Sequence, residues 1–238
     1  MLFSMDDVSV LYEDNHLLVV VKPQNMPVME DSSKDDDLLN VLKNWLKEKY
    51  QKPGDVYLGL VHRLDRPTGG VMVFAKTSKA ADRLCAAIRE REVEKNYLAV
   101  INGSLKNESG ELVNWLKKNP NTNMVYIATS LTEGAKKAVL KYRQLESKGA
   151  ITLVKVSLET GRSHQIRVQM AAQNCPLFGD VKYGDKLSKG SNLALWAYEL
   201  KFTHPVTGDS MVFVAYPPED KEPWKKFELK KYIENYSM

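Results

Sequence analysis

Asp65 is the first candidate for chemistry because it stands between two arginines. Arg63 and Arg66 flank it, and the Pro-Thr-Gly-Gly sequence that follows predicts a tight turn. Guanidinium groups so close in the chain favour the charged form of a carboxylate. An ionised carboxylate is a potential nucleophile. The same spacing is also typical of a surface ion pair that closes a loop, so the spacing alone leaves both interpretations open.

A second candidate patch precedes a predicted helix later in the chain. Residues 160–162 predict a turn, and Ser163 is expected to begin a helix that continues through Met170. His164 and Gln165 then lie in the first turn of that helix, where backbone N–H groups favour anions. For His164 alone a structural role is the more common explanation.

The elements around Asp65 are predicted to form a rigid support for it. Residues 71–75 are an apolar run typical of a buried strand. Ser78 is expected to cap a helix with apolar residues at helical spacing up to Ile88. Residues 95–100 then predict a returning strand. Further runs that predict strands lie at 8–12, 17–21, 140–146, 151–158, 193–202 and 211–215, and residues 102–123 are rich in turn formers and are expected to be peripheral.

The composition is that of a soluble globular protein. The 238 residues are 43% hydrophobic and 27% charged, and Lys and Arg exceed Asp and Glu by four. This excess is modest, so any RNA binding depends on a local patch. The two cysteines lack the paired spacing of a zinc or redox site. No signal peptide and no apolar run of 18 residues is present, so we expect a cytoplasmic protein without a membrane segment.

Taken in order, these motifs resemble those of the RluA family of pseudouridine synthases. The sequence around Asp65 is similar to the family motif His-Arg-Leu-Asp-X-X-Thr-Ser-Gly, with Gly69 where the family commonly has Ser. Two further motifs, ending at Tyr97 and at Arg167 (Gly-Arg-Ser-His-Gln-Ile-Arg), also match. The resemblance covers residues 8–216. One departure is a tryptophan, Trp196, where the pattern often has His.

The resemblance implies a fold and a reaction. The fold is α+β, with a long, mostly antiparallel mixed sheet, flanking helices and a central RNA-binding cleft. A single catalytic domain is expected over residues 1–238, with its core at about 8–216, and without the small N-terminal S4 domain that many relatives carry. The reaction is the isomerisation of a flipped-out uridine in RNA to pseudouridine. It involves no redox step and no group transfer, so neither a cofactor nor a metal is expected.

The resemblance also implies roles for individual residues. Asp65 acts at the sugar as a nucleophile or a base, Arg167 pairs with it, and Tyr97 stacks on uracil and moves a proton. Arg63 occupies the position that fills the vacated stack, although an ion pair with Asp65 is the simpler alternative. The expected RNA contacts are His62, Arg63, Arg66, Lys95, Arg162, His164 and Gln165.

The expected partner is a stem-loop of ribosomal or transfer RNA, bound by a monomer. Selection of this RNA is expected to rest on the cleft and on residues 102–123. Two other functions stay open: a catalytically silent RNA-binding protein of the same fold, and a hydrolase of glycosidic bonds. The hydrolase is disfavoured because that chemistry needs two acids beside the bond, and the motif contains one.

Overall fold

The computed structural model describes residues 2–184 and 190–233, which divide into two compact units. Unit 1 comprises the described residues up to Glu94 together with 199–215, and unit 2 comprises 95–198 and the residues from Tyr216 onward. Strand β10 (Leu195–Thr203) contributes residues to both units. The single-domain expectation stays a prediction.

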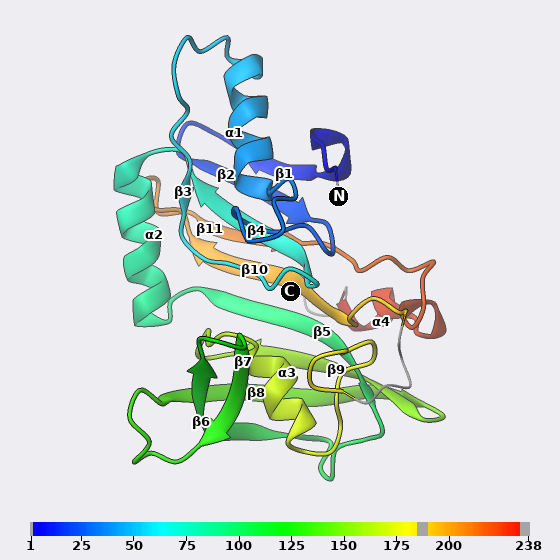
Figure 1. The fold of residues 1–238 in the computed structure, drawn as a ribbon. Helices are drawn as coiled ribbons and strands as arrows, with labels where there is room; N and C mark the ends of the chain where they lie inside the picture. Colours follow the sequence, from blue (N-terminus) through cyan, green and yellow to red (C-terminus); the bar gives the residue numbers. More distant parts are fainter. Residues whose placement is uncertain (1, 185–189, 234–238) are drawn as a thin grey trace. The chain divides into compact units, whose positions relative to one another are not determined.

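Unit 1 is a sheet with two main helices (Figure 1). Its strand order is β1-β2-β4-β10, with β3 paired to β4 and β11 paired to β10. The strands are β1 (Ser9–Glu13), β2 (Leu17–Lys22), β3 (Gly59–Leu60), β4 (Gly69–Ala75) and β11 (Ser210–Val214). The helices are the 3-10 turn η1 (Met5–Asp7), α1 (Leu38–Lys49) and α2 (Ser78–Glu90).

The two central strands of unit 1 are buried because they are apolar on both faces. All seven residues of β4 are buried, and so are five of the six in β2. The antiparallel register sets Leu17 opposite Ala75 and Lys22 opposite Gly70. This register brings Lys22 to the start of β4, directly after the Asp65 loop. The cap of α2 is Thr77, whose side chain accepts from the backbone N–H of Ala80, so the expected cap at Ser78 is wrong by one residue.

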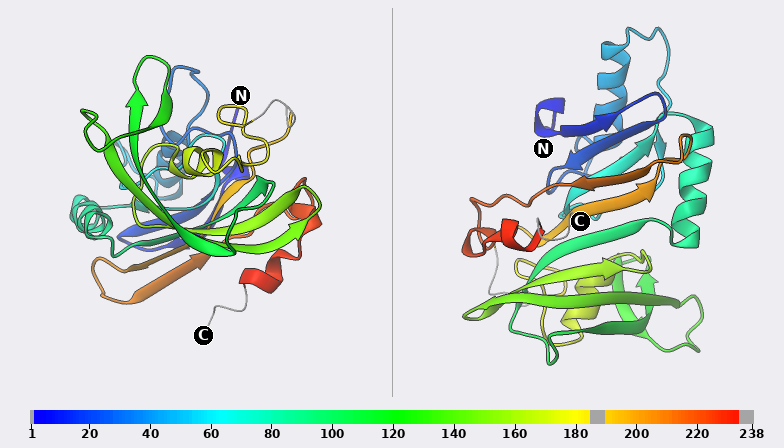
Figure 2. Two further views of the ribbon diagram at one scale, coloured as in Figure 1. Left: turned by 90° about the horizontal axis from the view of Figure 1, so that it is seen from below. Right: turned by 180° about the vertical axis from the view of Figure 1, so that it is seen from behind.

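Unit 2 is a second set of strands with one helix packed on it (Figure 2). Its order is β10-β5-β9-β8-β6-β7, and the left view of Figure 2 shows α3 against one face of the curved strands. The elements are β5 (Glu94–Asn102), β6 (Ser109–Asn119), β7 (Met124–Ala128), β8 (Lys136–Lys148), β9 (Ile151–Leu158), α3 (Gln165–Ala171), η3 (Trp224–Lys226) and α4 (Leu229–Ile233).

Residues 102–123 contain a regular strand although the segment is rich in turn formers, and their expected peripheral position stays a prediction. Strand β6 occupies half of this segment and pairs with both β8 and β7. Leu116 on β6 packs with Val125, Ala138 and Val168 in a small core beneath α3. Tertiary pairing therefore decides the structure here, against the local abundance of turn formers.

Helix α3 begins two residues later than expected. His164 is its N-cap and has a left-handed backbone conformation, with φ of 52°, so Ser163 lies outside the helix. The expected α+β fold with a large mixed sheet and few helices is confirmed. Within the units, the pairs β1–β2, β2–β4, β5–β9, β8–β9 and β6–β8 are antiparallel. No helix in the described ranges is long and apolar enough to cross a bilayer.

Candidate active site

Asp65 lies in a tight turn immediately before a buried strand. The backbone N–H of Thr68 donates to the carbonyl of Asp65 at 2.9 Å, which closes the turn, and β4 begins at Gly69. The Thr68 side chain is buried, whereas Asp65 is half-buried. The turn therefore fixes the backbone of the candidate acid and leaves its side chain accessible.

Lys22 is a buried cation that supports this turn from the end of β2. Its Nζ donates to the carbonyls of Pro23, at 2.9 Å, and Arg66, at 3.0 Å. Burial lowers the pKa of Lys22 to about 7, with help from the charge of Arg66 and against the attraction of the Asp65 carboxylate. Sequence reasoning missed this residue. The available signal was a lysine at the end of an otherwise apolar strand.

Arg66 is held by a group of acceptors that we call the Arg66 clasp: Asn25, Asp31, Ser33 and Asp35. Its Nε donates to the carbonyl of Asn25 at 3.0 Å, and its Nη1 donates to Ser33 at 2.8 Å and to Asp31 at 3.4 Å. Its Nη2 pairs with Asp35. Most of the five guanidinium donors are thus used within unit 1. RNA contact by Arg66 stays a prediction.

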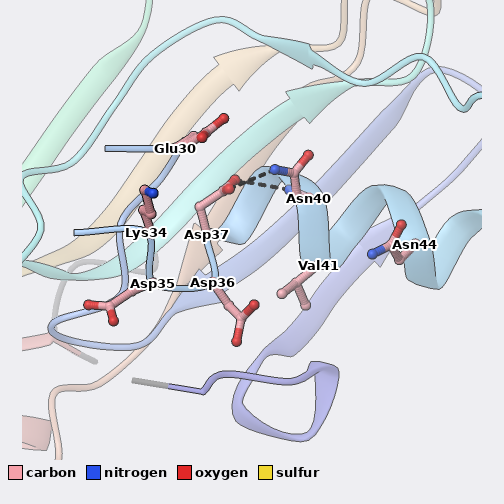
Figure 3. A pocket seen from close by; sticks show the side chains of 8 residues that line it. All are labelled: Glu30, Lys34, Asp35, Asp36, Asp37, Asn40, Val41 and Asn44. Atoms are coloured by element: carbon pink, nitrogen blue, oxygen red, sulfur yellow. Dashed lines mark hydrogen bonds between the residues drawn. The ribbon is translucent and has the colours of Figure 1, made fainter. Parts of the chain in front are cut away.

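A cavity of about 520 Å³ lies beside the clasp at the start of α1 (Figure 3). The carboxylates of Glu30, Asp35, Asp36 and Asp37 contribute to its lining. Asp37 caps α1 by accepting from the backbone N–H of Asn40 at 3.0 Å and from its side-chain amide at 2.7 Å, as the dashed lines show. This concentration of negative charge repels phosphate, so the cavity is not suited to RNA.

The other two predicted residues of this loop differ in their surroundings. His62 Nε2 accepts from the backbone N–H of Val73 at 3.1 Å, which assigns the ring proton of the neutral form to Nδ1. Arg63 is exposed, and its guanidinium donates to the sulfur of Met29 at 3.8 Å. The charge of Arg63 is therefore at the surface, two positions before Asp65 in the sequence.

In unit 2, strand β5 carries the predicted tyrosine in its buried part. Tyr97 is 7% exposed and lies opposite Val156 of β9. The neighbouring Asn96 accepts from the Ser157 hydroxyl at 2.5 Å, which ties β5 to β9. Burial lowers the pKa of Lys95, the residue before Asn96. Strand pairing therefore fixes the backbone on which Tyr97 stands.

The turn before α3 is built around the side chain of Gln165. Its Oε1 accepts from the Thr160 hydroxyl at 2.8 Å and from the backbone N–H of Arg162 at 3.0 Å. Its Nε2 donates to the carbonyl of Val139 at 3.1 Å. Gln165 is buried and Arg162 is exposed, with its Nε donating to the carbonyl of Lys137. These bonds give Gln165 a structural role in the turn. Its contact with RNA stays a prediction.

Arg167 forms a buried, two-point ion pair with Asp180. Its Nε donates to Oδ2 at 2.8 Å and its Nη2 donates to Oδ1 at 2.7 Å. The side chains are 6% and 0% exposed. Although burial disfavours the charge of Asp180, the hydrogen bonds and charge of Arg167 hold the pKa of that carboxyl below its ordinary value.

Tyr183 completes the surroundings of Arg167. The Cζ of Arg167 lies 5.2 Å from the centre of the Tyr183 ring, which is the geometry of a cation–π contact. The Tyr183 hydroxyl accepts from the backbone N–H of Val125 at 2.9 Å and lies 2.6 Å from Nδ1 of His164. Sequence reasoning missed both Asp180 and Tyr183. The available signal was the sequence Gly-Asp-X-X-Tyr-Gly at 179–184.

The predicted site residues are divided between the two units. His62, Arg63, Asp65 and Arg66 belong to unit 1, and Lys95, Tyr97, Arg162, His164, Gln165 and Arg167 belong to unit 2. Within unit 1 the structure brings Lys22 and the clasp to the Asp65 turn. Within unit 2 it brings Asp180, Tyr183 and His164 to Arg167. Among the residues described, no three His, Cys, Asp or Glu side chains are grouped to hold a metal ion.

Comparison with known proteins gives matches over most of the chain. Ribosomal large subunit pseudouridine synthase D of Neisseria meningitidis serogroup A is 37% identical over an alignment of 224 residues, and the match covers 89% of this chain and 58% of that protein. Dual-specificity RNA pseudouridine synthase RluA of Haemophilus influenzae is 36% identical over an alignment of 222 residues, and the match covers 87% of this chain and 91% of that protein. The chain spans about three fifths of the length of several synthase D relatives.

A solved structure and a family profile agree with these matches. The structure of human RNA Pseudouridylate Synthase Domain Containing 4 superposes with a TM-score of 0.74 at 26% identity and covers 88% of each chain. Residues 16–172 match the family described as RNA pseudouridylate synthase. Because this match covers more than half of the sequence and contains the Asp65 turn, β5 and α3, the chain belongs to the RNA pseudouridylate synthase family.

Proposed function

We propose that this protein isomerises uridine in RNA to pseudouridine. The observation that carries the proposal is the Asp65 turn: a half-buried carboxylate on a backbone fixed by the Thr68 hydrogen bond and by the buried ammonium of Lys22. A carboxylate in a turn that is held beside a buried strand is suited to a reaction that depends on positioning. Family membership identifies the reaction class.

The reaction exchanges one bond to the sugar for another. The N1–C1′ bond of uridine breaks, the uracil turns, and a C5–C1′ bond forms. C5 then loses its proton and N1 gains one, so the atoms balance without a further reactant. Asp65 acts at the sugar as nucleophile or base, and Tyr97 provides a ring for stacking on uracil and a hydroxyl for proton movement. Arg167 is proposed to pair with Asp65 and to orient its carboxylate.

RNA contact is assigned to cationic and polar side chains of both units. Arg63, which is exposed, is proposed to occupy the space that the flipped nucleotide leaves. Lys95, Arg162 and His164 are proposed to contact the RNA backbone or bases near the start of α3, and His62 is proposed to do so beside Asp65. Arg162 is exposed in unit 2, which supports its role.

The proposed substrate is a short stem-loop of ribosomal or transfer RNA. Two relatives support this choice through their names, because one acts on the ribosomal large subunit and the other has dual specificity. Hairpin loops offer unstacked bases that are easy to extrude. We further propose that the protein acts as a monomer in the cytoplasm.

The test is release of tritium from RNA labelled at uracil C5. RNA from cells that lack their own uridine modifications is incubated with wild type, Asp65→Asn and Asp36→Asn. Asp36 is a matched control because it is an exposed acid of unit 1 outside the Asp65 turn. We expect release by wild type and Asp36→Asn only, with RNA binding kept by Asp65→Asn. Release by Asp65→Asn would contradict the assignment of the catalytic acid.

Two further readouts separate the rival functions. Free uracil in the supernatant identifies a hydrolase, and RNA binding without tritium release identifies a silent binding protein. Isolated hairpins cut from the modified RNA are then compared with the full RNA. Equal turnover on both supports the stem-loop proposal, whereas modification of the full RNA alone contradicts it.

A further inference from the structure

We propose that Asp180 and Tyr183 are positioning residues that set the direction of the Arg167 guanidinium during the reaction. The inference rests on the proposed function, which gives Arg167 a role at the reacting nucleotide. It adds two residues of the 179–184 loop to those that support the reaction. Neither is expected to touch the RNA, because each acts through Arg167.

The first support is the geometry of the ion pair. Asp180 engages one edge of the guanidinium, through Nε and Nη2, at 2.8 and 2.7 Å. A guanidinium is planar and rigid, so a two-point contact on one edge fixes the directions of its other N–H groups. The orientation of Arg167 is thereby set before any substrate binds.

The second support is the ring of Tyr183. It lies beneath the guanidinium at 5.2 Å and restrains rotation of the plane. The ring is itself held, because its hydroxyl accepts from the N–H of Val125 and is hydrogen-bonded to His164. His164, the left-handed N-cap residue of α3, is thus connected through Tyr183 to Arg167.

The third support is that the loop fixes Asp180 independently of Arg167. The carboxylate accepts from the backbone N–H groups of Lys182 and Tyr183 at 2.9 and 3.1 Å. Gly179 has a φ of 76°, and a Cβ there would lie 2.2 Å from the carbonyl oxygen of Asn192. A Cβ on Gly184 would lie 2.5 Å from the carbonyl oxygen of Asp180. The backbone path of this loop therefore requires both glycines.

A purely structural role for this pair is the alternative. Burying two charges contributes little net stability, because loss of hydration offsets their attraction. If these two positions were needed only for packing, apolar side chains would stabilise the loop equally well. The placement of Asp180 against the specific edge of an arginine in the family motif favours the positioning role, and kinetics distinguish the two.

The decisive variant is Asp180→Asn. The amide oxygen still accepts from the N–H groups of Lys182 and Tyr183, but the amide nitrogen now faces the Nε donor of Arg167. We expect the single-turnover rate of tritium release at saturating RNA to fall about 10- to 100-fold, while the dissociation constant for RNA changes less than threefold. Lys182→Gln is the matched control in the same loop, because it keeps the backbone N–H that donates to Asp180 and changes a side chain whose Nζ donates to the carbonyl of Asn123 at 2.8 Å. It is expected to keep the wild-type rate.

A double-mutant comparison tests whether Asp180 acts through Arg167. If it does, Asp180→Asn combined with Arg167→Gln is no slower than Arg167→Gln alone. If Asp180→Asn instead causes a structural defect, the rate of the double variant falls by the product of the two single effects. The melting temperature of Asp180→Asn then falls as well. Multiplicative effects, or a wild-type rate for Asp180→Asn, overturn the inference.

Tyr183 provides a second test that does not depend on the folding of Asp180→Asn. Tyr183→Phe keeps the ring, and Tyr183→Leu removes it. We expect Tyr183→Leu to be at least fivefold slower than Tyr183→Phe at saturating RNA, and equal rates overturn the role of the ring. The wild-type protein and Asp65→Asn separate the two levels of proposal. If the wild type releases tritium and the Asp180 and Tyr183 variants are not impaired, only this inference fails. If the wild type releases no tritium, the proposed function itself fails, and turnover by Asp65→Asn contradicts only the assignment of the catalytic acid.

Discussion

The imidazole of His204 donates from Nε2 to the carboxylate of Asp14 at 2.9 Å, although 190 positions separate the two residues in the chain. The other ring nitrogen, Nδ1, accepts from the backbone N–H groups of Val206 and Thr207 at 3.2 and 2.9 Å. These two bonds assign the proton of the neutral ring to Nε2. The β1–β2 turn is therefore joined to the turn that follows β10.

Loss of this contact is expected to destabilise unit 1. His204→Phe keeps an aromatic ring but leaves two backbone N–H groups and the Asp14 carboxylate without their partner. We expect the free energy of unfolding to fall by about 1–3 kcal/mol, measured by chemical denaturation at pH 7. Asn15→Ala is the control, because Asn15 is exposed in the same β1–β2 turn. Equal stability of His204→Phe and wild type would contradict this prediction.

The pKa of Lys22 predicts an unusual dependence of stability on pH. The folded value is about 7 against an ordinary 10.5, so between these values the unfolded chain binds more protons than the folded chain. Stability contributed by Lys22 therefore increases as the pH rises from 7 toward 10. Relative to Lys22→Met, wild type is expected to gain up to about 1.4 kcal/mol per pH unit in this range.

Denaturation of both proteins at several pH values measures this difference, in which other titrating groups cancel. Lys79→Met serves as the control because Lys79 is exposed on α2. Its difference from wild type is expected to stay constant with pH. A constant difference for Lys22→Met as well would show that the buried ammonium does not lose its proton in the folded protein.

The Arg66 clasp predicts that Arg66 affects turnover more than RNA binding. Asp35→Asn and Arg66→Gln are each expected to lower the rate at saturating RNA a few-fold, and the double variant is expected to match the slower single variant. The effect on stability is small, about 1 kcal/mol or less, because the arginine is 36% exposed. Asp36→Asn, at a neighbouring position in the same acidic segment, is expected to behave as wild type.

The salt dependence of RNA affinity distinguishes the clasp from direct contact with phosphate. If Arg66 neutralises a phosphate, Arg66→Gln reduces the slope of log affinity against log salt by about one. The clasp instead predicts an unchanged slope. A reduced slope would favour the RNA contact that the sequence motif predicts for Arg66.

The parts of the fold that follow from local sequence are those with strong apolar patterns. The strands β2 and β4 are predictable because nearly every residue is apolar, and the turn at Asp65 is predictable from Pro and Gly. Strand β6 is not predicted, because turn-forming residues are frequent in the segment 102–123 that contains it. Its partners, β7 and β8, decide its conformation.

The site shows the same division between local and distant information. Asp65, Tyr97 and Arg167 stand in motifs that the sequence displays directly. Lys22 and Asp180 are not among the predicted site residues, since their roles depend on the register of β2 with β4 and on the path of the 179–184 loop. A lysine or an aspartate alone carries no signal of such a partner.

The shared strand β10 has a consequence for synthesis on the ribosome. Unit 1 is discontinuous: its last two strands, residues 199–215, are translated after the whole of β5 to β9. The β2 and β4 strands and the Asp65 turn must therefore wait, with the edge of β4 that pairs with β10 uncovered, while about one hundred residues of unit 2 emerge. An uncovered strand edge invites wrong pairing. Completion of the last two strands is thus the step at which a nascent chain first acquires a finished unit around Asp65.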